Sequence, residues 1–326
     1  MGECQVSVVI PCYRAGRYLS EAINSVLTQE SRVSPLEVIV VDNHSPDDET
    51  RDALASWRRD GRVHIVENAE DLGPAAGRNV GIGVARGEWV AFLDADDVWL
   101  PGSLEARWRA IESEPDAEWL GADYRMWYED GSLEETGHYQ KDDVVGRVLA
   151  PAYESGRTLR LSRPISQFLH FSLAWIGTVM VKRNLLLRVG GFEPSLRVAE
   201  DVLLWYRLAA VTDFFFVPKI VALYRQHPES LTSRERPGGQ LRLAWDRVYT
   251  LLRSDPAFRP HQGQLRAKVA AAHERAAYYH RGRGEAWKAA RAAASALTYT
   301  PARPAIWKNL LAALLRLRVE ALYFWS

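Results

Sequence analysis

The sequence predicts an α/β fold followed by a C-terminal α-helical region, and three observations lead to this prediction. Short β-rich runs alternate with longer helical runs through the first hundred residues, which is typical of βαβ units. These β-rich runs are continuously apolar, which indicates strands covered on both faces. From about Leu241 the chain changes to Ala- and Arg-rich helical runs, after Pro237-Gly238-Gly239. We therefore expect one domain over residues 1–238 and a helical region over residues 239–326.

The elements of the first domain follow in order from the hydrophobic pattern. Residues 6–10 are predicted to form a buried strand, and residues 18–28 a helix with its apolar side chains on one side. Strands are then expected at 36–41, 63–66 and 89–93, with helices at 47–58 and 74–85 between them. Because ligands bind beyond the carboxyl ends of such strands, the residues that follow each strand are the candidate site.

The chain beyond residue 115 has a weaker pattern. We expect a strand at 118–128, a hairpin turn at Glu129-Asp130-Gly131-Ser132, β structure at 172–181 and a helix at 200–210. Residues 134–166 are polar and are expected to be irregular. In the C-terminal region, helices are expected at 270–280, 285–297 and 305–324, separated by segments rich in Gly or Pro.

Composition excludes several classes of protein. The 326 residues include two cysteines, Cys4 and Cys12, which excludes a disulfide framework and a cysteine-based zinc cluster. No apolar run reaches the roughly 20 residues that a membrane-spanning helix needs. The N-terminal residues lack the basic lead of a signal peptide. We therefore expect a cytoplasmic protein.

The net charge of zero hides an asymmetry along the chain. Residues 1–240 carry 26 Lys and Arg against 36 Asp and Glu, whereas residues 241–326 carry 15 against 5. The basic tail either pairs with the acidic domain or meets an anionic surface such as membrane lipid. Residues 305–326 have a broad apolar face that includes Trp307, Leu310, Leu311, Leu314, Leu317, Ala321 and Phe324. Packing on neighbouring helices is the first interpretation of this face, and peripheral contact with the inner face of the membrane is the second. Nucleic acid is not an expected partner, because no basic patch with interleaved aromatic residues stands out in the first 240 residues.

The strongest local signal is the run Asp94-Ala95-Asp96-Asp97 directly after an apolar strand. Residues two apart in extended backbone point the same way, so Asp94 and Asp96 can face one ligand together. Adjacent carboxylates repel unless a cation lies between them, and their hard oxygen atoms suit Mg²⁺ or Mn²⁺. The alternative is an acidic turn that caps the following helix.

Two other nucleotide-binding folds are excluded. The run Gly81-Ile82-Gly83-Val84-Ala85-Arg86-Gly87 has the wrong spacing for a dinucleotide fingerprint, and it ends a helix instead of starting one. The phosphate-binding pattern GxxxxGK[ST] does not occur in the chain. A second acidic pair, Glu200-Asp201, starts an amphipathic helix, where it serves either as a general base or only as a complement to the helix dipole.

Six short motifs lie in order between residues 6 and 230, and together they carry a family resemblance. They are residues 8–13 (VVIPCY), 40–47 (VVDNHSPD), 77–81 (GRNVG), 92–97 (FLDADD), 189–192 (VGGF) and 200–201 (ED). The chain resembles glycosyltransferase family 2, whose members are inverting, depend on a nucleotide sugar and have the GT-A fold. His44 departs from the family pattern, which usually has Gly after the preceding Asp or Asn. The resemblance implies a Rossmann-type nucleotide-sugar-binding domain with a mixed central sheet.

The resemblance also implies roles for individual residues. Pro11 and Tyr13 are expected to line the pocket for the base, and Asp42 to accept a hydrogen bond from that base. Arg78 is expected to help hold the nucleotide, and Asp94 to lie near the ribose and the metal. Asp96 is expected to bind the Mn²⁺ or Mg²⁺ ion that bridges the diphosphate. His227 is expected to contact the diphosphate or the metal.

The expected catalytic residue is Asp201, which would take the proton from the acceptor hydroxyl with Glu200 beside it. The implied function is metal-dependent transfer of a hexose from a nucleoside diphosphate sugar, with UDP as the first expectation. The expected acceptor is a glycan or a lipid-linked sugar in cell-surface polysaccharide or glycolipid assembly. The alternative is a non-catalytic nucleotide-sugar-binding scaffold whose helical tail recruits partners. Trp175 is a candidate for stacking on a sugar, although with 12 tryptophans in the chain a core position is the more common use.

Overall fold

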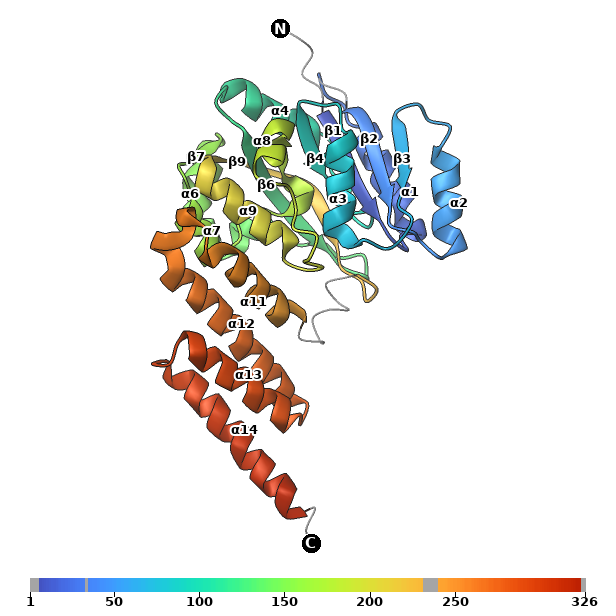
Figure 1. Ribbon diagram of the computed structural model, residues 1–326. Coiled ribbons are helices and arrows are strands. Elements are labelled where there is room, and N and C mark those ends of the chain that lie inside the picture. The colour runs from blue at the N-terminus through green and yellow to red at the C-terminus, as the bar shows by residue number, and fades with distance from the viewer. Residues whose placement is uncertain (1–5, 33–34, 231–239, 324–326) are drawn as a thin grey trace. The chain divides into compact units, whose positions relative to one another are not determined.

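The structure is a computed structural model that describes residues 6–32, 35–230 and 240–323 (Figure 1). The chain divides into two compact units, Met1–His227 and Pro228–Ser326. The boundary predicted between residues 238 and 239 lies outside the described residues. Each unit is described by itself below.

The first unit is built on a mixed sheet, as predicted. Among the described residues the sheet has nine strands, in the order β3-β2-β1-β4-β8-β6-β9-β5 with β7 paired to β9. The strands are β1 Val6–Cys12, β2 Pro35–Asp42, β3 Val63–Glu67, β4 Trp89–Phe92, β5 Val98–Trp99, β6 Trp119–Trp127, β7 Leu159–Leu161, β8 Met180–Lys182 and β9 Phe214–Arg225. β1 runs parallel to β2 and β4, and β2 to β3, whereas β8 runs antiparallel to β4 and β6. The carboxyl ends of the four parallel strands therefore meet at one edge of the sheet.

The helices that follow the first three strands are α1 Gly16–Leu27, α2 Asp48–Trp57 and α3 Gly73–Val84, close to the predicted ranges. Figure 1 shows these helices beside the part of the sheet formed by β1, β2 and β3. The buried side chains of α1 recur every three or four residues, which is why the pattern predicts it. α2 begins after Asp47, whose carboxylate accepts a hydrogen bond of 2.9 Å from the Thr50 N–H.

Helix α3 lies unusually close to the sheet because of its glycines. A Cβ atom on Gly81 would lie 2.3 Å from Cγ1 of Val9 on β1, and one on Gly77 would lie 2.8 Å from Nδ2 of Asn43. A larger side chain at either position would require a shift of the helix or of the Val9 or Asn43 side chain that it meets. This close packing brings Arg78, between the two glycines, to the end of the parallel strands.

Two predictions for the middle of the chain are wrong. Residues 134–166 are not irregular, because they contain α5 His138–Lys141, α6 Val145–Ser155 and β7. The sequence obscures α6 because Pro151 lies inside it, and proline is unfavourable in a helix interior. Residues 172–181 are mostly not β structure, since the 3-10 turn η1 Ile176–Thr178 precedes the short strand β8. The first unit also contains α4 Ser103–Ser113, α7 Ile165–His170, α8 Arg183–Arg188 and α9 Glu200–Val211.

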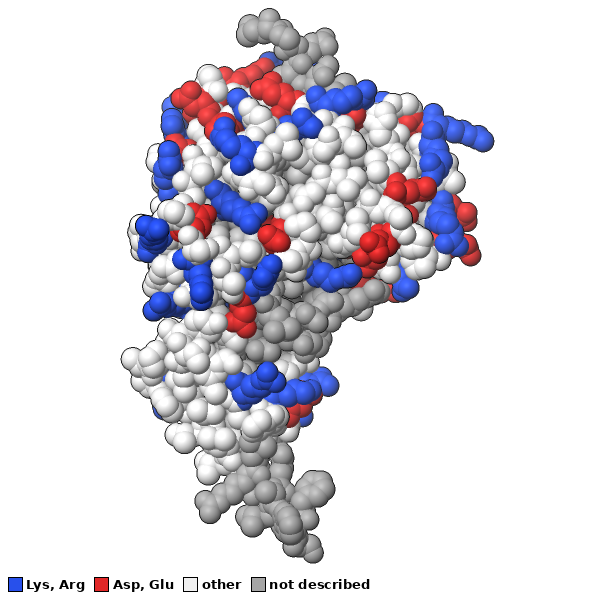
Figure 2. All heavy atoms as spheres, viewed as in Figure 1, with Lys and Arg blue, Asp and Glu red and all other residues white. Residues whose placement is uncertain are grey.

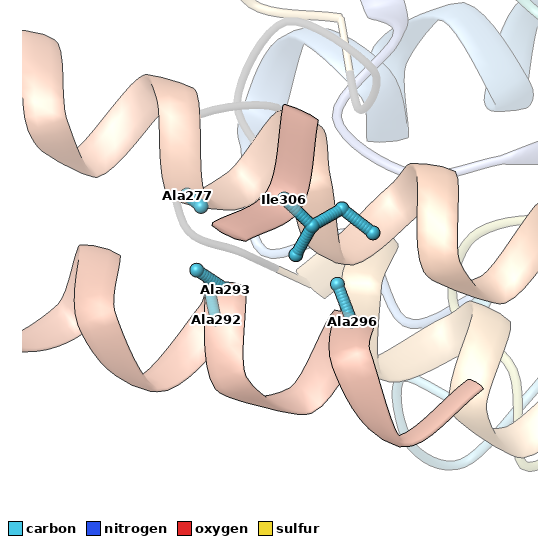
Figure 3. Packing of buried hydrophobic residues seen from close by; sticks show 5 residues of the cluster. All are labelled: Ala277, Ala292, Ala293, Ala296 and Ile306. Carbon is cyan, nitrogen blue, oxygen red and sulfur yellow. The ribbon is translucent and has the colours of Figure 1, made fainter. Parts of the chain in front are cut away.

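The second unit is helical, as predicted. Its elements are α11 Gln240–Arg253, η3 Pro256–His261, α12 Gln262–Gly282, α13 Ala286–Tyr299 and α14 Pro304–Tyr323. A cluster of small side chains packs α12, α13 and α14 together, made of Ala277, Ala292, Ala293, Ala296 and Ile306 (Figure 3). The alanines bring the helix axes close, which explains the Ala-rich composition of this region.

The apolar face predicted on α14 is divided between two environments. Ile306, Leu310 and Ala313 pack on the neighbouring helices, which is the interpretation placed first. On another side of α14, Trp307, Leu311, Leu314 and Leu315 have exposed fractions of 47%, 57%, 45% and 64%. The side chains of Leu317, Ala321 and Phe324 lie outside the described part of the chain. Packing on α12 and α13 therefore uses only part of the apolar surface of α14.

Charged side chains are distributed differently on the two units. On the face seen in Figure 2, Lys and Arg are interspersed with Asp and Glu over the first unit, which is typical of a solvated surface. The second unit shows mostly uncharged surface with a group of basic side chains. Across residues 6–32, 35–230 and 240–323, no helix has the length and hydropathy needed to cross a bilayer.

Candidate active site

Three of the predicted donor-binding residues lie at the ends of β1 and β2. Pro11 is half-buried in β1, Tyr13 follows the strand with 41% of its surface exposed, and Asp42 is buried at the end of β2. The Asp42 carboxylate accepts hydrogen bonds from the Oγ of Ser45 at 2.6 Å and from the Ser45 backbone N–H at 3.2 Å. The Ser45 hydroxyl also accepts from the Arg14 N–H at 3.1 Å, which ties the ends of the two strands together.

The turn after β2 contains the position at which the sequence departs from the family pattern. His44 adopts φ 61°, in the left-handed region that favours glycine. Histidine is among the residues that tolerate this conformation best after glycine, and the His44 side chain is exposed. The turn therefore keeps a glycine-like backbone without glycine.

Arg78 joins two acidic groups that are far apart in the sequence. Its Nη2 donates to Asp94 Oδ1 at 2.6 Å, and its Nη1 donates to Glu200 Oε1 at 2.7 Å. Burial alone would lower the pKa of Arg78, but the charges of Asp94 and Glu200 raise it above its ordinary value. One guanidinium group therefore links the acidic run after β4 to the N-terminus of α9. The prediction that Arg78 holds the nucleotide stays a prediction, since both of its terminal nitrogens already have carboxylate partners.

The VGGF motif, residues 189–192, is hydrogen-bonded to Asn79 of α3. Asn79, next to Arg78, donates to the Phe192 carbonyl at 2.7 Å and accepts from the Phe192 N–H at 2.9 Å. Gly191 has φ 63°, and a Cβ atom there would lie 2.5 Å from Asn79 Oδ1. The Phe192 ring lies 5.4 Å from the Arg78 guanidinium, which gives the buried cation an aromatic face. The motif therefore contacts both Asn79 of α3 and, through Phe192, the Arg78 guanidinium.

The paired carboxylates at the start of α9 have different environments. Glu200 is buried and bonded to Arg78, whereas Asp201 is partly exposed and its Oδ1 accepts from the Val202 N–H at 2.7 Å. Burial raises the pKa of Glu200 to about 7. The charge of Arg78 opposes this rise, whereas the charge of Asp201 adds to the rise. Burial also raises the pKa of Asp201, again opposed by Arg78. Burial thus raises the pKa of both carboxyl groups, and of the two it is Glu200 that accepts a hydrogen bond from Arg78.

The acidic run after β4 separates its three carboxylates. Asp94 faces Arg78, whereas Asp96 Oδ2 lies 2.9 Å from His227 Nε2. Asp97, for which the motif predicts no role, is buried and accepts from the Arg225 N–H at 2.8 Å. Burial and the charges of Asp96 and Asp94 raise the pKa of Asp97 well above its ordinary value.

Arg225 is a site residue that the sequence did not single out. Its Nε donates to the Asp96 carbonyl at 2.8 Å, and its guanidinium lies 3.8 Å from the Trp127 ring and 4.7 Å from the Tyr18 ring. The Tyr18 ring in turn lies 4.9 Å from the His227 ring. Arg225 therefore fixes the acidic turn through hydrogen bonds to Asp96 and Asp97. Its position within the run Tyr224-Arg225-Gln226-His227 is the only sequence signal for it.

Asp96 and His227 are the two residues that the sequence predicts as metal ligands. Asp96 Oδ2 and His227 Nε2 lie 2.9 Å apart, within hydrogen-bonding distance of each other. The other ring nitrogen of His227 is buried and has no hydrogen-bond partner among the described residues. The described part of the chain contains no group of three or more His, Cys, Asp or Glu side chains arranged around a common ion. Mg²⁺ in such sites is usually bound by one or two carboxylates together with substrate phosphates and water.

The structure thus brings the predicted residues together in two connected groups. Arg78 links Asp94 to Glu200, and the acidic turn links Asp94 to Asp96 and His227. Pro11, Tyr13 and Asp42 form the second group, which adjoins the first where Gly77 of α3 packs on Asn43.

Comparison with known proteins defines the class to which this fold and site belong. A family model described as "Glycosyl transferase family 2" matches residues 7–185. The chain belongs to glycosyl transferase family 2, a family of transferases. An uncharacterized protein of Mycobacterium tuberculosis (strain CDC 1551 / Oshkosh), MT1568, is 30% identical over 260 residues, which cover 77% of this chain and 76% of MT1568.

One further relative and one solved structure are similar to this chain. TuaG of Bacillus subtilis (strain 168), named for teichuronic acid biosynthesis, is 42% identical over 101 residues, which cover 31% of this chain and 39% of TuaG. This chain therefore spans less than half of the length of TuaG. The crystal structure of Staphylococcus aureus TarS 1–349 with UDP-GlcNAc matches with a TM-score of 0.60 and 19% identity, covering 91% of this chain and 82% of TarS 1–349. The likeness to TarS supports the fold.

Proposed function

We propose that this chain transfers a sugar from a nucleoside diphosphate sugar to an acceptor hydroxyl, with inversion at the anomeric carbon. The observation that carries the proposal is the Arg78 bridge. The bridge links the acidic turn, which we propose to bind a metal and the diphosphate, to the carboxylate pair of α9. An inverting displacement needs this arrangement, because the leaving group and the attacking hydroxyl lie on opposite faces of the sugar.

For the donor we propose a UDP-sugar. The TarS structures with UDP and UDP-GlcNAc are of a protein with the same fold, which supports a uridine nucleotide. The exposed ring of Tyr13 offers a stacking surface for the base, and Asp42, fixed by Ser45, offers it a carboxylate acceptor. Asp96 and His227 would hold Mn²⁺ or Mg²⁺, which would neutralise charge on the diphosphate leaving group when bound.

For the base we propose Asp201 in preference to Glu200. The Glu200 carboxylate is buried and accepts a hydrogen bond from Arg78, so its use as a base would compete with that ion pair. Asp201 is partly exposed and lies at the start of α9. We assign to Glu200 the role of orienting Arg78, and through it Asp94.

For the acceptor we propose a glycan or lipid-linked sugar in cell-surface polysaccharide or glycolipid assembly, with peripheral contact to the inner face of the membrane. The name of TuaG, which is similar to this chain over 101 residues, supports a cell-surface polymer. The exposed apolar side of α14 and the basic charge of residues 241–326 support the membrane contact.

Two variants separate the proposed roles. We expect Asp96→Ala to weaken metal-dependent donor binding by about tenfold or more, since a metal ligand is lost. We expect Asp201→Asn to leave donor binding intact and to lower kcat for transfer by about 10²- to 10⁴-fold. Binding is measured by thermal shift with a panel of nucleotide sugars, with and without Mn²⁺, and transfer by release of the nucleoside diphosphate.

The outcomes are distinct. Equal loss of donor binding in both variants would contradict the separation of roles. A wild-type protein that binds a nucleotide sugar but shows no turnover over a panel of glycan and lipid acceptors would favour the non-catalytic scaffold instead.

A further inference from the structure

Four aromatic rings from four different elements form a cluster in the first unit. Tyr124 on β6 is buried, with 6% of its surface exposed, and its ring centroid lies 4.6 Å from Trp175 and 4.8 Å from His138. Trp175, just before η1, lies 5.0 Å from Tyr224 on β9. Trp175, Tyr224 and His138 are all partly exposed. In this cluster the buried ring of Tyr124 therefore packs beneath three other rings that are partly accessible to solvent.

The cluster adjoins both halves of the candidate active site. Tyr224 directly precedes Arg225, which bonds to Asp97 and to the Asp96 carbonyl. The Trp175 ring lies against Gly177, where a Cβ atom would be 2.5 Å from it, and the Gly177 carbonyl accepts from Trp99 Nε1 at 3.0 Å. On the other side, Tyr139 packs edge-on against Tyr124 at 5.3 Å. Burial raises the pKa of Tyr139, and the charge of Asp201 contributes, so Tyr139 lies within electrostatic range of the proposed base.

Buried polar groups fix the position of α5, the short helix that begins at His138. The Asp123 carboxylate is completely buried and accepts from the Tyr139 N–H at 2.9 Å and from the Tyr153 hydroxyl. Gly137 leaves room for it, since a Cβ atom there would lie 1.9 Å from Asp123 Oδ2. Burying a carboxylate costs free energy unless several hydrogen bonds satisfy it. This local structure positions α5 tightly over β6.

A second carboxylate orients the His138 ring. Glu134 Oε1 lies 3.3 Å from His138 Nδ1 and also pairs with Lys141. His138 therefore stacks on Tyr124 at an interplanar angle of 25° while 30% of its side chain stays exposed. Core packing alone would not need two buried acidic groups to hold a ring that remains accessible to solvent.

We propose that Trp175, Tyr224 and His138 form the subsite for a pyranose ring of the acceptor, and that the acceptor end recognised here is a carbohydrate. This inference rests on the proposed function and assigns the residues that would bind its carbohydrate acceptor. Aromatic faces pack against the apolar C–H face of a sugar, while nearby polar groups such as Glu134 and His138 bind its hydroxyls. A phosphate-terminated acceptor would need free cations, but Arg225 and Lys141 are already paired with carboxylates.

The test is saturation-transfer-difference NMR on the full chain with UDP and Mg²⁺ present. The probes are the methyl β-pyranosides of glucose, galactose and N-acetylglucosamine, methyl α-mannopyranoside, and glycerol 3-phosphate as the phosphate-bearing alternative. We expect saturation at the ring C–H protons of at least one pyranoside, and at least a fivefold weaker signal for that sugar in Trp175→Ala. Trp175→Phe, which keeps an aromatic face, is expected to retain at least half of the signal.

The control is Trp287→Ala, which removes a tryptophan that is 69% exposed on α13 in the second unit and is expected to leave the signal unchanged. If Trp175→Ala does not fold, Tyr224→Leu and His138→Ala carry the test, each with an expected loss of at least threefold. Absence of saturation for every pyranoside, saturation of glycerol 3-phosphate alone, or a wild-type signal in the folded variants overturns the inference. Failure of the proposed function is seen separately, because nucleotide sugars would then not shift the Tm of the wild type.

Discussion

At the scale of single residues, Arg78 is the group on which the site depends. It is a buried cation between two carboxylates, and neither Asp94 nor Glu200 has another arginine or lysine partner among the described residues. Removing one member of such a group leaves buried charge without compensation, which costs far more than the loss of a surface ion pair. The contact joins residues 122 positions apart, so no local pattern could predict it.

We predict that Arg78→Met lowers the free energy of unfolding by about 3–5 kcal/mol near pH 8. Arg78 opposes the rise in the pKa of Glu200, so its removal raises that pKa further above 7. A carboxyl group whose pKa is raised by folding favours the folded state at low pH, and this contribution is lost as the pH rises through the folded pKa. The loss in the variant is therefore largest at pH 8 and smaller near pH 5, as measured by urea denaturation at both values.

The matched control is Arg51→Met, which breaks an exposed ion pair with Asp48 in α2. Its effect is expected to stay below about 1 kcal/mol at either pH. An Arg78→Met variant that loses no more stability than Arg51→Met would show that the bridge does not hold the site together.

At the scale of elements, sequence prediction succeeded where the hydrophobic pattern of the element's own residues indicates a helix or a strand. α1 and the strands β1 to β4 have regular apolar spacing, and the motifs that follow them carry most of the predicted site residues. The sequence did not predict α6, because Pro151 lies inside this helix. It did not predict β7, because this short strand is stabilised by its pairing with β9. Arg225 and the aromatic cluster could not be predicted as groups, since the pairing of β6 with β9 brings Tyr124 and Trp127 near Tyr224 and Arg225. Of the cluster, the sequence singled out Trp175 as a candidate for stacking on a sugar, without its neighbours.

The glycines of α3 provide a test at this scale. We predict that Gly81→Ala lowers the free energy of unfolding by about 1–3 kcal/mol, because the new methyl group overlaps Val9 and displaces the helix from β1. Gly83→Ala is the matched control in the same helix, with nothing within 4 Å of the new Cβ atom. It is expected to stabilise the protein by about 0.5–1 kcal/mol through helix propensity.

The same pair of variants links packing to the site. Displacement of α3 also moves Arg78, so Gly81→Ala is expected to reduce the Tm shift produced by a nucleotide sugar, while Gly83→Ala leaves that shift unchanged. Similar stability of both variants in chemical denaturation would show that the close approach of α3 to β1 is not required.

At the scale of the whole molecule, the chain combines an acidic catalytic unit with a basic helical unit. The small side chains of α12 and α13 pack against one side of α14 and leave a second apolar side exposed at Trp307, Leu311 and Leu315. An exposed apolar strip beside basic residues is typical of a helix that lies on an anionic membrane surface. Each basic residue near such a surface contributes about 1 kcal/mol, so the excess charge of residues 241–326 favours weak binding that salt reverses.

We predict that the protein co-sediments with vesicles that contain phosphatidylglycerol, and not with vesicles of phosphatidylcholine alone. Raising the ionic strength from about 0.01 M to about 1 M shortens the Debye length from about 30 Å to about 3 Å and should release the protein. The double variant Leu311→Ser with Leu315→Ser should lose most of the binding, because it removes exposed apolar groups and leaves Ile306, Leu310 and Ala313 to pack α14. Leu187→Ser, which changes a leucine that is 53% exposed on α8 of the first unit, is the control and should bind like the wild type. If wild type and double variant remain equally in the supernatant at low salt, α14 has a structural role only and the membrane contact is wrong.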